Sequence, residues 1–403
     1  MVDLDALRAT PNALARHYSR FGVAEKLLLT GHSHQAWPDV AAAGQLAALT
    51  DAATYADGKW EAAFAKADRL RAAVRGLMAD PSAEIALGAN THELVLRFLS
   101  ALAIVARPRL VTTDGEFHTL RRQLARLGEA GIEVVRVPAA PVDTLAERMA
   151  AAADDRTAAV LVSAVLFETS RIVPGLADLA GVCARYGAEL LVDAYHALGV
   201  VPFDVPAAGL ADAWVVGGGY KYLQLGEGNC FLRLPGHADR LRPVITGWYA
   251  EFAELSQAAG ESVGYGPGAI RFAGATYDPT SHYRAASVLD FFHDAELTMP
   301  LLRQVSQHQT TLLAQRFDAL DAPDGLVTRD RTTPRSAFGG FLSLRSPHAG
   351  ELCAALAERG VRTDSRGEYL RFGPAPYLSD DQLTDAMAAL GEIINARPDD
   401  TGR

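Results

Sequence analysis

Cysteine is scarce in this chain, and its three cysteines are too few and too scattered to form a disulfide framework. Cys183, Cys230 and Cys353 are an odd number of thiols in 403 residues, which is typical of a protein kept in a reducing compartment. Long hydrophobic runs are also missing, since no apolar stretch approaches the roughly 20 residues that span a bilayer. The first residues, Met1–Asp5, contain no basic stretch followed by an apolar run, so no secretory signal is expected. We therefore expect a cytoplasmic protein without a membrane partner.

Positive charge is in deficit. The chain carries 48 Asp and Glu against 38 Lys and Arg, a formal net charge of −10, so a nucleic-acid partner is not expected. Nucleotide-binding fingerprints are absent as well. The glycines at 217–219 are followed by Tyr222 where a dinucleotide fingerprint needs another glycine, and no P-loop is present,. A nucleotide-dependent oxidoreductase is therefore disfavoured.

Short apolar runs alternate with helical stretches from residue 84 onward, which predicts an α/β fold with a mainly parallel sheet flanked by helices. The length exceeds one ordinary core, so a second, smaller α+β domain is expected at the C-terminus. Expected strands are 84–88, 109–112, 132–137, 158–163, 189–193, 213–217 and 229–234, then 340–344 and 369–372; expected helices are the first 20 or so residues, 38–79, 92–105, 118–130, 143–153, 176–186 and 281–320. The expected division is an N-terminal segment 1–50 packing with the small domain, a large domain 51–285 and a small domain 286–403.

Two of these strands end at charged residues that make a chemical pair. One ends at Asp193, and the other leads through three glycines to Lys221, 28 positions later. Pyridoxal phosphate (PLP) enzymes need a lysine for a Schiff base and an acid that keeps the pyridinium nitrogen protonated. Taken alone, Lys221 is typical of a solvated lysine and Asp193 of a turn cap. The apolar strand before Lys221 and the tyrosines on either side of it favour the cofactor interpretation, in which the glycines let a flat cofactor approach the backbone.

Further residues suit the remaining parts of such a cofactor. Asn90 and Thr91 follow a strand and begin a helix, which suits a phosphate, although a plain N-cap has the same pattern. Phe117 follows the next strand and offers a flat face for a ring, with the core as the alternative and His118 as the second candidate. His196, three residues after Asp193, suits a contact near the phenolic oxygen of the cofactor or a satisfied core position.

Three polar side chains suit the substrate. Arg371 lies between apolar neighbours on an expected strand, so it needs a carboxylate: that of an amino-acid substrate, or Asp364 or Glu368 in an internal salt bridge. His32 and His34 have the spacing of a metal pair, but no nearby Cys or Asp cluster completes a ligand set,. A polar loop lining the substrate pocket is the preferred interpretation, and no metal is expected.

The chain resembles the class V aminotransferase superfamily of fold-type I PLP enzymes, and within it kynureninase. Residues 193–199 are similar to the motif D-x-x-H-x-x-G and residues 219–228 to Y-K-Y-L-N-x-G-x-G. The pattern G-V-x-x-D-x-R followed by L-R-F-G-x-x-P-x-Y, typical of kynureninase, is similar to residues 360–377, in which Tyr377 directly follows Pro376. Shorter similarities are found at Gly247–Tyr249, Phe167–Arg171 and Phe272–Thr276.

The resemblance implies a homodimer that acts on a small amino-acid substrate. It implies that Lys221 carries the cofactor and moves protons at Cα, that Asp193 and His196 contact the ring, and that Tyr220 contacts the phosphate and donates protons. Asn90, Thr91, Thr169, Trp248 and Thr276 are further cofactor contacts, with Thr276 arriving from the second subunit; Phe117 stacks on the ring, Arg371 binds the substrate α-carboxylate and His34 lies in the substrate pocket.

Five residues depart from the resemblance. Leu120 replaces an aspartate, His32 and His34 alter the N-terminal pocket motif, Tyr195 replaces an alanine, and Gln224 replaces an asparagine. They are expected near the part of the substrate that carries its aryl group. The implied activity is hydrolysis of the Cβ–Cγ bond of kynurenine or a related amino acid, giving alanine and an aromatic acid. The alternatives are transamination, or lyase or epimerase chemistry on another amino acid, and a binding protein without catalysis. Cysteine desulfurase is disfavoured because residues 363–366 before Arg371 contain no cysteine.

Overall fold

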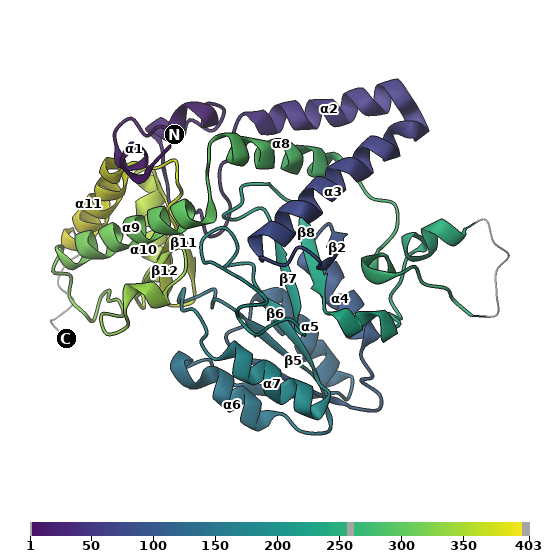
Figure 1. Cartoon of the computed structure of the whole chain (residues 1–403). Helices are drawn as coiled ribbons and strands as arrows, with labels where there is room; N and C mark the ends of the chain where they lie inside the picture. The colour runs from purple at the N-terminus through teal and green to yellow at the C-terminus, as the bar shows by residue number, and fades with distance from the viewer. Residues whose placement is uncertain (1, 256–261, 397–403) are drawn as a thin grey trace.

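The computed structural model describes residues 2–255 and 262–396 and is built around a seven-stranded sheet with helices on both faces (Figure 1). The strand order is β2-β8-β7-β6-β5-β3-β4. The five strands β3 to β7 are all parallel to one another, and β8 is antiparallel to both β2 and β7. The predicted mainly parallel α/β sheet is confirmed. The strands are β2 Glu84–Gly88, β3 Arg109–Thr113, β4 Glu133–Val137, β5 Thr157–Ser163, β6 Glu189–Asp193, β7 Trp214–Gly218 and β8 Cys230–Leu234.

Helices cover the sheet because its central strands are apolar on both sides, as β5 and β7 show by being buried at every residue,. Helices α4 (Thr91–Ala101) and α5 (His118–Glu129) pack on one face through residues that include Phe98 and Leu124. Helices α3 (Lys59–Leu77), α6 (Leu145–Ala152) and α7 (Leu176–Tyr186) contribute to the core on the other face. Both faces of the sheet are therefore closed to solvent, and the strand ends are left as the place for a site.

Three helical predictions differ from the structure. Within described residues 2–20 the only α-helix is α1 (Leu4–Arg8). The stretch 38–79 is two helices, α2 (Val40–Tyr55) and α3, separated by a short turn at 56–58. The stretch 281–320 is also two helices, α8 (Thr280–Asp294) and α9 (Met299–Asp318), with Pro300 in the first turn of α9. Proline lacks an N–H and clashes with the preceding turn, so it is accepted only where a helix begins.

The C-terminal part forms a smaller unit to which the N-terminal segment is joined. Strands β9 (Leu342–Arg345), β11 (Asp364–Arg366) and β12 (Tyr369–Phe372) form an antiparallel sheet, with α10 (Ala349–Glu358) and α11 (Asp380–Asn395) packed nearby. Strand β1 (Leu27–Leu28) pairs with β10 (Val361–Arg362), and Arg8 forms a salt bridge with Asp380. The predicted domain boundary at 285–286 falls inside α8, so we propose that the small domain begins after this helix. Within the described residues, no helix is long and apolar enough to cross a membrane.

Candidate active site

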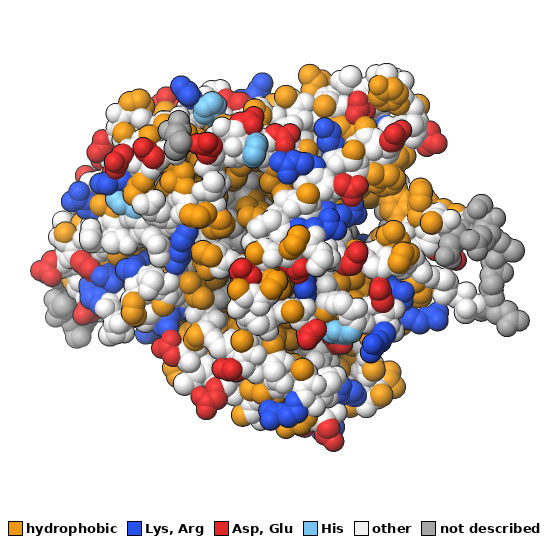
Figure 2. Space-filling view, viewed as in Figure 1, with side chains coloured by type: hydrophobic (Ala, Val, Ile, Leu, Met, Phe, Trp, Pro, Cys, Tyr) orange, Lys and Arg blue, Asp and Glu red, His pale blue; other side chains and the backbone are white. Residues whose placement is uncertain are grey.

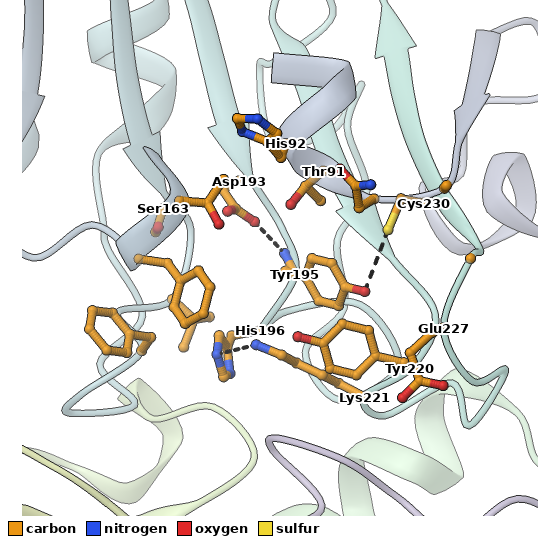
Figure 3. Close-up of a pocket in the computed structure, with 17 residues that line it drawn as sticks. Thr91, His92, Ser163, Asp193, Tyr195, His196, Tyr220, Lys221, Glu227 and Cys230 are labelled. Carbon is orange, nitrogen blue, oxygen red and sulfur yellow. Dashed lines mark hydrogen bonds between the residues drawn. The ribbon is translucent and has the colours of Figure 1, made fainter. Parts of the chain in front are cut away.

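The carboxyl ends of β3, β5, β6 and β7 meet at one cavity of about 250 Å³, shown in Figure 3. Parallel strands end at the same edge of a sheet, which is where open α/β sheets bind their ligands. Residues far apart in the sequence are brought together there for this reason. Seven of the predicted site residues line the cavity: Asn90, Thr91, Phe117, Asp193, His196, Tyr220 and Lys221.

Lys221 is buried in this cavity, three residues after the end of β7. Its Nζ lies 2.6 Å from Nε2 of His196, and Figure 3 shows the two side chains pointing toward each other. Burial lowers the pKa of Lys221 to about 7, against the opposing effect of Asp193. Burial also lowers the pKa of His196, so its ring is neutral and accepts a hydrogen bond from the amine,. Near neutral pH a large fraction of Lys221 is therefore the unprotonated amine, the form that attacks a carbonyl carbon.

Asp193 presents a buried carboxylate to the same cavity. One of its oxygens accepts a hydrogen bond from the backbone N–H of Tyr195 at 2.8 Å. Burial raises the pKa of Asp193, while the Tyr195 hydrogen bond and the charge of Lys221 act in the opposite direction. The described residues provide no ion pair for this carboxylate. It is therefore placed to stabilise a positive charge on a bound ligand.

Helix α4 begins at the opposite wall of the cavity. Asn90 is its N-cap, and the side-chain oxygen of Asn90 accepts a hydrogen bond from the backbone N–H of Glu93 at 2.9 Å. The hydroxyl of Thr91, in the first turn, also faces the cavity (Figure 3). A helix start carries partial positive charge and free N–H groups, which favour an anion such as a phosphate. The N-cap interpretation is confirmed, and the phosphate interpretation stays a prediction that is compatible with it, because the N-cap borders the cavity.

Aromatic side chains supply the flat walls. The ring centre of Phe117 lies 5.5 Å from Nζ of Lys221, and Phe117 packs edge-on against Phe167. Tyr220 lines the cavity beside Lys221, and burial raises the pKa of its phenol to about 12. Tyr220 therefore keeps its proton at neutral pH and is able to donate it. The second candidate for ring stacking, His118, packs against Phe117 and Phe167 without lining the cavity.

Arg371 lies beside the cavity and is paired with Asp364, one of the two internal partners considered from the sequence. Its Nε and Nη2 donate to the two oxygens of Asp364 at 2.8 and 2.5 Å, and its Nη1 donates to the backbone oxygen of Phe167. Burial opposes ionisation of Asp364, but hydrogen bonds and charges from His32 and Arg371 outweigh it and hold the pKa of Asp364 below its usual range. The guanidinium still has N–H groups that these contacts do not use.

The two loop histidines have separate surroundings. His32 is buried, and its Nε2 lies 2.8 Å from Asp364, so it supports the pair between Asp364 and Arg371. His34 is exposed and stacks on Tyr220 with ring centres 4.9 Å apart. Its Nε2 lies 3.6 Å from a carboxylate oxygen of Glu227, which lines the cavity. No cluster of three or more His, Cys, Asp or Glu suited to a metal ion is found in the described ranges.

Three predicted cofactor contacts are not brought to the cavity of this chain. Thr169 accepts a hydrogen bond from the backbone N–H of Arg171 in a local turn. Trp248 is 43% exposed and packs on Tyr249 and Phe252. Thr276 is also exposed. Within one chain these three side chains therefore do not reach the ligand space.

The glycines before Lys221 have a different role from the predicted one. A Cβ placed on Gly218 would lie 2.4 Å from the hydroxyl oxygen of Tyr195 and 2.7 Å from the sulfur of Cys230. A Cβ on Gly219 would meet Leu225 at 2.5 Å. The prediction that these glycines make room for a flat cofactor is therefore wrong at 218 and 219, because neighbouring side chains fill the space.

Glu116 is a buried acid next to the cavity that the sequence pattern did not reveal. Its carboxyl group accepts hydrogen bonds from the backbone N–H of Ser163 at 2.9 Å and from the Ser163 hydroxyl at 2.6 Å. Burial and, to a smaller extent, the charge of Asp193 raise the pKa of Glu116 to about 8, against the opposing effect of the two Ser163 hydrogen bonds. Ser163 itself lines the cavity. The only local signal is that Glu116 directly precedes Phe117, which does not distinguish it from a surface acid.

The Glu116→Gln variant is expected to become more stable than wild type as the pH rises, because wild type loses stability and the variant does not. The folded protein holds the Glu116 proton to about pH 8, whereas the unfolded chain releases it near its ordinary pKa of about 4.3. Wild type therefore loses stability as pH rises through this window, and glutamine, which cannot ionise, does not. Thermal melting of both proteins at several pH values should show an advantage for Glu116→Gln that grows toward about pH 8 and then stays constant. A pH-independent difference would contradict the elevated pKa.

Comparisons with known proteins agree with this architecture. Residues 302–390 match the family model described as Kynureninase C-terminal domain. The uncharacterized aminotransferase YcbU of Bacillus subtilis (strain 168) is 22% identical over 338 residues, which cover 84% of this chain and 86% of YcbU.

Solved structures give the fold. A mutant of C-DES with glycine covalently linked to its PLP cofactor is similar with a TM-score of 0.81, at 19% identity, covering 94% of this chain and 98% of the other. The apo cysteine desulfurase from Thermococcus onnurineus NA1 has a TM-score of 0.80 at 15% identity, covering 98% of this chain and 99% of the other.

The fold is that of the fold-type I enzymes, with the buried lysine and aspartate at the strand ends of the larger sheet. The resemblance to the class V aminotransferase superfamily that the sequence predicts is confirmed, and residues 302–390 are similar to the C-terminal domain of kynureninase.

Proposed function

We propose that the protein is a PLP-dependent hydrolase of the kynureninase type, which cleaves the Cβ–Cγ bond of kynurenine or a related amino acid with water and releases alanine and an aromatic acid. The observation that carries the proposal is the meeting of Lys221 and Asp193 in one cavity of a chain whose C-terminal residues 302–390 match the kynureninase family. The cavity supports the cofactor, and the C-terminal match supports the reaction.

The residues present fit PLP part by part. Lys221 supplies a partly neutral amine, Asp193 a carboxylate to which the described residues give no ion-pair partner, α4 an anion-binding helix start, and Phe117 a flat wall. His196 adds a buried Nδ1 for which the described residues provide no hydrogen-bond partner. PLP bound there would supply an electron sink for the carbon atoms next to the amino group of the substrate.

The side chains around the cavity divide the remaining work. Lys221, held by His196, takes and returns the proton at Cα, because its lowered pKa matches this task near neutral pH,. Tyr220, with its raised pKa, donates the proton that Cβ takes up when the Cβ–Cγ bond breaks, which gives the methyl group of alanine. Arg371 binds the α-carboxylate through N–H groups not engaged by Asp364. Glu227 lines the cavity and exposed His34 stacks on Tyr220 beside it, and the aryl part of the substrate would lie there.

A class V aminotransferase is the second candidate, and the likeness to YcbU over 84% of the chain favours it. Both activities use the same lysine, aspartate and arginine. Cysteine desulfurase, despite the shared fold, is disfavoured by two placements. Residues 364–366 form the ordered strand β11 and contain no cysteine, and Cys353 lies in α10, with its sulfur 3.6 Å from the backbone oxygen of Thr363.

We further propose that two copies of the chain associate, and that Trp248 and Thr276 reach the cavity of the second copy. Both are exposed in the single chain. Figure 2 shows hydrophobic side chains gathered where residues 244–255 meet α3, and the ring contacts of Trp60, Phe64 and Phe252 lie in this region. Exposed apolar patches of this kind mark interaction sites. A cytoplasmic location is part of the same proposal.

The proposed reaction predicts alanine release from L-kynurenine or 3-hydroxy-L-kynurenine by the PLP-loaded protein. Alanine and the aromatic acid should form in equal amounts, without a 2-oxo acid acceptor, because hydrolysis consumes only water. Chromatographic measurement of both products checks this, with Lys221→Ala as the inactive control. Turnover that requires an added 2-oxo acid and yields its amino acid would instead establish the aminotransferase. A spectral change on adding kynurenine without product would contradict this substrate class and leave the cofactor site in place.

A further inference from the structure

Tyr195 occupies the floor of the cavity, where the resembling family has an alanine. The ring is 8% exposed and lines the cavity, two residues after Asp193. Its hydroxyl lies 3.6 Å from the sulfur of Cys230, and its ring packs against Tyr220 with centres 4.9 Å apart. The Tyr195 side chain also lies close to Gly218, where a Cβ would collide with its hydroxyl. The ring is therefore held on three sides and is not free to swing away from the cavity.

Tyr195 and Phe117 both face the amine of Lys221. Nζ of Lys221 lies 4.8 Å from the ring centre of Tyr195 and 5.5 Å from that of Phe117. The ring contacts found in the described residues join Phe117 to His118 and Phe167, and Tyr195 to Tyr220, but do not join Phe117 to Tyr195. The two aromatic rings thus stand apart, on different strand ends, with the amine within reach of both.

We propose that Tyr195 is the second aromatic wall of the cofactor site, so that the pyridine ring bound at Lys221 stacks on Tyr195 with one face and on Phe117 with the other. The inference rests on the proposed function, since it concerns the same cofactor. Asp193, which accepts a hydrogen bond from the backbone N–H of Tyr195, keeps the nitrogen of the bound pyridine ring positively charged,. A flat cationic ring is attracted to the electron-rich face of a tyrosine, so this wall favours the protonated cofactor.

Gly218 makes this wall possible. The absence of a side chain at 218 leaves room for the phenol, because a Cβ there would collide with the Tyr195 hydroxyl. Tyr195 and Gly218 are thus a matched pair on the neighbouring strand ends of β6 and β7. The departure at Tyr195, which the sequence placed near the aryl part of the substrate, is on this inference a feature of cofactor binding.

The test is PLP affinity, measured by titrating apo-protein and following the absorbance of bound cofactor and the quenching of protein fluorescence. Tyr195→Ala is expected to weaken binding by about tenfold to 100-fold, from lost stacking and burial. Tyr195→Phe, which keeps the ring, should bind within about threefold of wild type. Tyr186→Ala, a partly exposed tyrosine on α7, is the control and should not change the affinity.

Each outcome separates the inference from the proposed function. Normal PLP binding by wild type with equal affinity in Tyr195→Ala would overturn the inference alone. Equal losses in Tyr195→Phe and Tyr195→Ala would overturn it as well, because the hydroxyl rather than the ring face would then be responsible. No binding by wild type would overturn the proposed function itself. Thermal melting of each apo-protein shows whether a loss of affinity reflects unfolding, and Tyr195→Phe keeps the test valid if the alanine variant does not fold.

Discussion

Replacing Lys221 with alanine is expected to abolish covalent attachment of the cofactor and to lower turnover by about 1,000-fold or more. Lys221 is the one lysine that lines the cavity among the described residues, and its Nζ is fixed by His196 at 2.6 Å. Burial lowers its pKa to about 7, so the amine is reactive near neutral pH. The fold should tolerate the change, because the described residues give the Lys221 side chain one hydrogen bond, to His196, and burial of an amine costs desolvation.

Reduction of the PLP-loaded protein with borohydride, followed by peptide mapping, measures attachment independently of activity. Wild type should carry the label on the peptide that contains Lys221, and Lys221→Ala should carry none. Added small primary amines should restore part of the turnover of Lys221→Ala, because they supply the missing proton acceptor. Lys26→Ala, which removes an exposed lysine, is the matched control. A label on a different lysine of the wild type would refute the assignment.

The sequence predicts the centre of the site well, for a physical reason. Asp193 and Lys221 each follow an apolar run, and parallel strands bring the ends of such runs to one edge of the sheet. Asn90 and Thr91 are found in the same way, because a strand end followed by an N-cap is a local pattern. These residues line the cavity in the structure.

Residues whose role depends on a distant partner are not predicted in this way. In the sequence Glu116 is indistinguishable from an ordinary surface acid, and only the structure shows the Ser163 hydroxyl 2.6 Å from its carboxyl group. The sequence predicts that Gly218 leaves space for a cofactor, whereas in the structure the Tyr195 side chain fills the space beside Gly218. The sequence left Arg371 with two alternatives, and only the fold of β11 against β12 places Asp364 opposite it. Side chains that do not line the cavity of their own chain, such as Thr276, cannot be assigned from local patterns at all.

The buried ionisable groups of the cavity are connected. Lys221, Asp193 and Glu116 are all buried, and burial disfavours the charged form of each,. Lys221 and Asp193 stabilise each other's charge, whereas Glu116 lies close to Asp193 and is disfavoured as an anion. A protonated Glu116 therefore leaves Asp193 as the negative charge that balances Lys221 or a cationic ring. Such clusters of shifted groups are typical of functional sites rather than of structural cores.

Arg371 is expected to determine the preference for a substrate with an α-carboxylate. Replacing Arg371 with glutamine should lower kcat/KM for the amino-acid substrate by about 100-fold, mainly through KM, because a charge-assisted pair is lost. Arg371→Lys should recover only part of this loss, since an ammonium cannot present the planar pair of N–H groups. The decarboxylated analogue of the substrate should be processed equally poorly by wild type and by Arg371→Gln.

The competing role for Arg371 is a purely structural ion pair with Asp364. Asp364→Asn distinguishes the two, because it breaks the ion pair and leaves the guanidinium in place. If Arg371 binds substrate, Asp364→Asn should lower the melting temperature while keeping the preference for the carboxylate over the decarboxylated analogue. Arg366→Gln, on the same hairpin and 3.7 Å from Asp364, is the control for nearby positive charge. A preference that survives in Arg371→Gln and Arg371→Lys would show that the carboxylate is bound elsewhere, and Arg371 would then only hold β11 and the His32 loop together through Asp364.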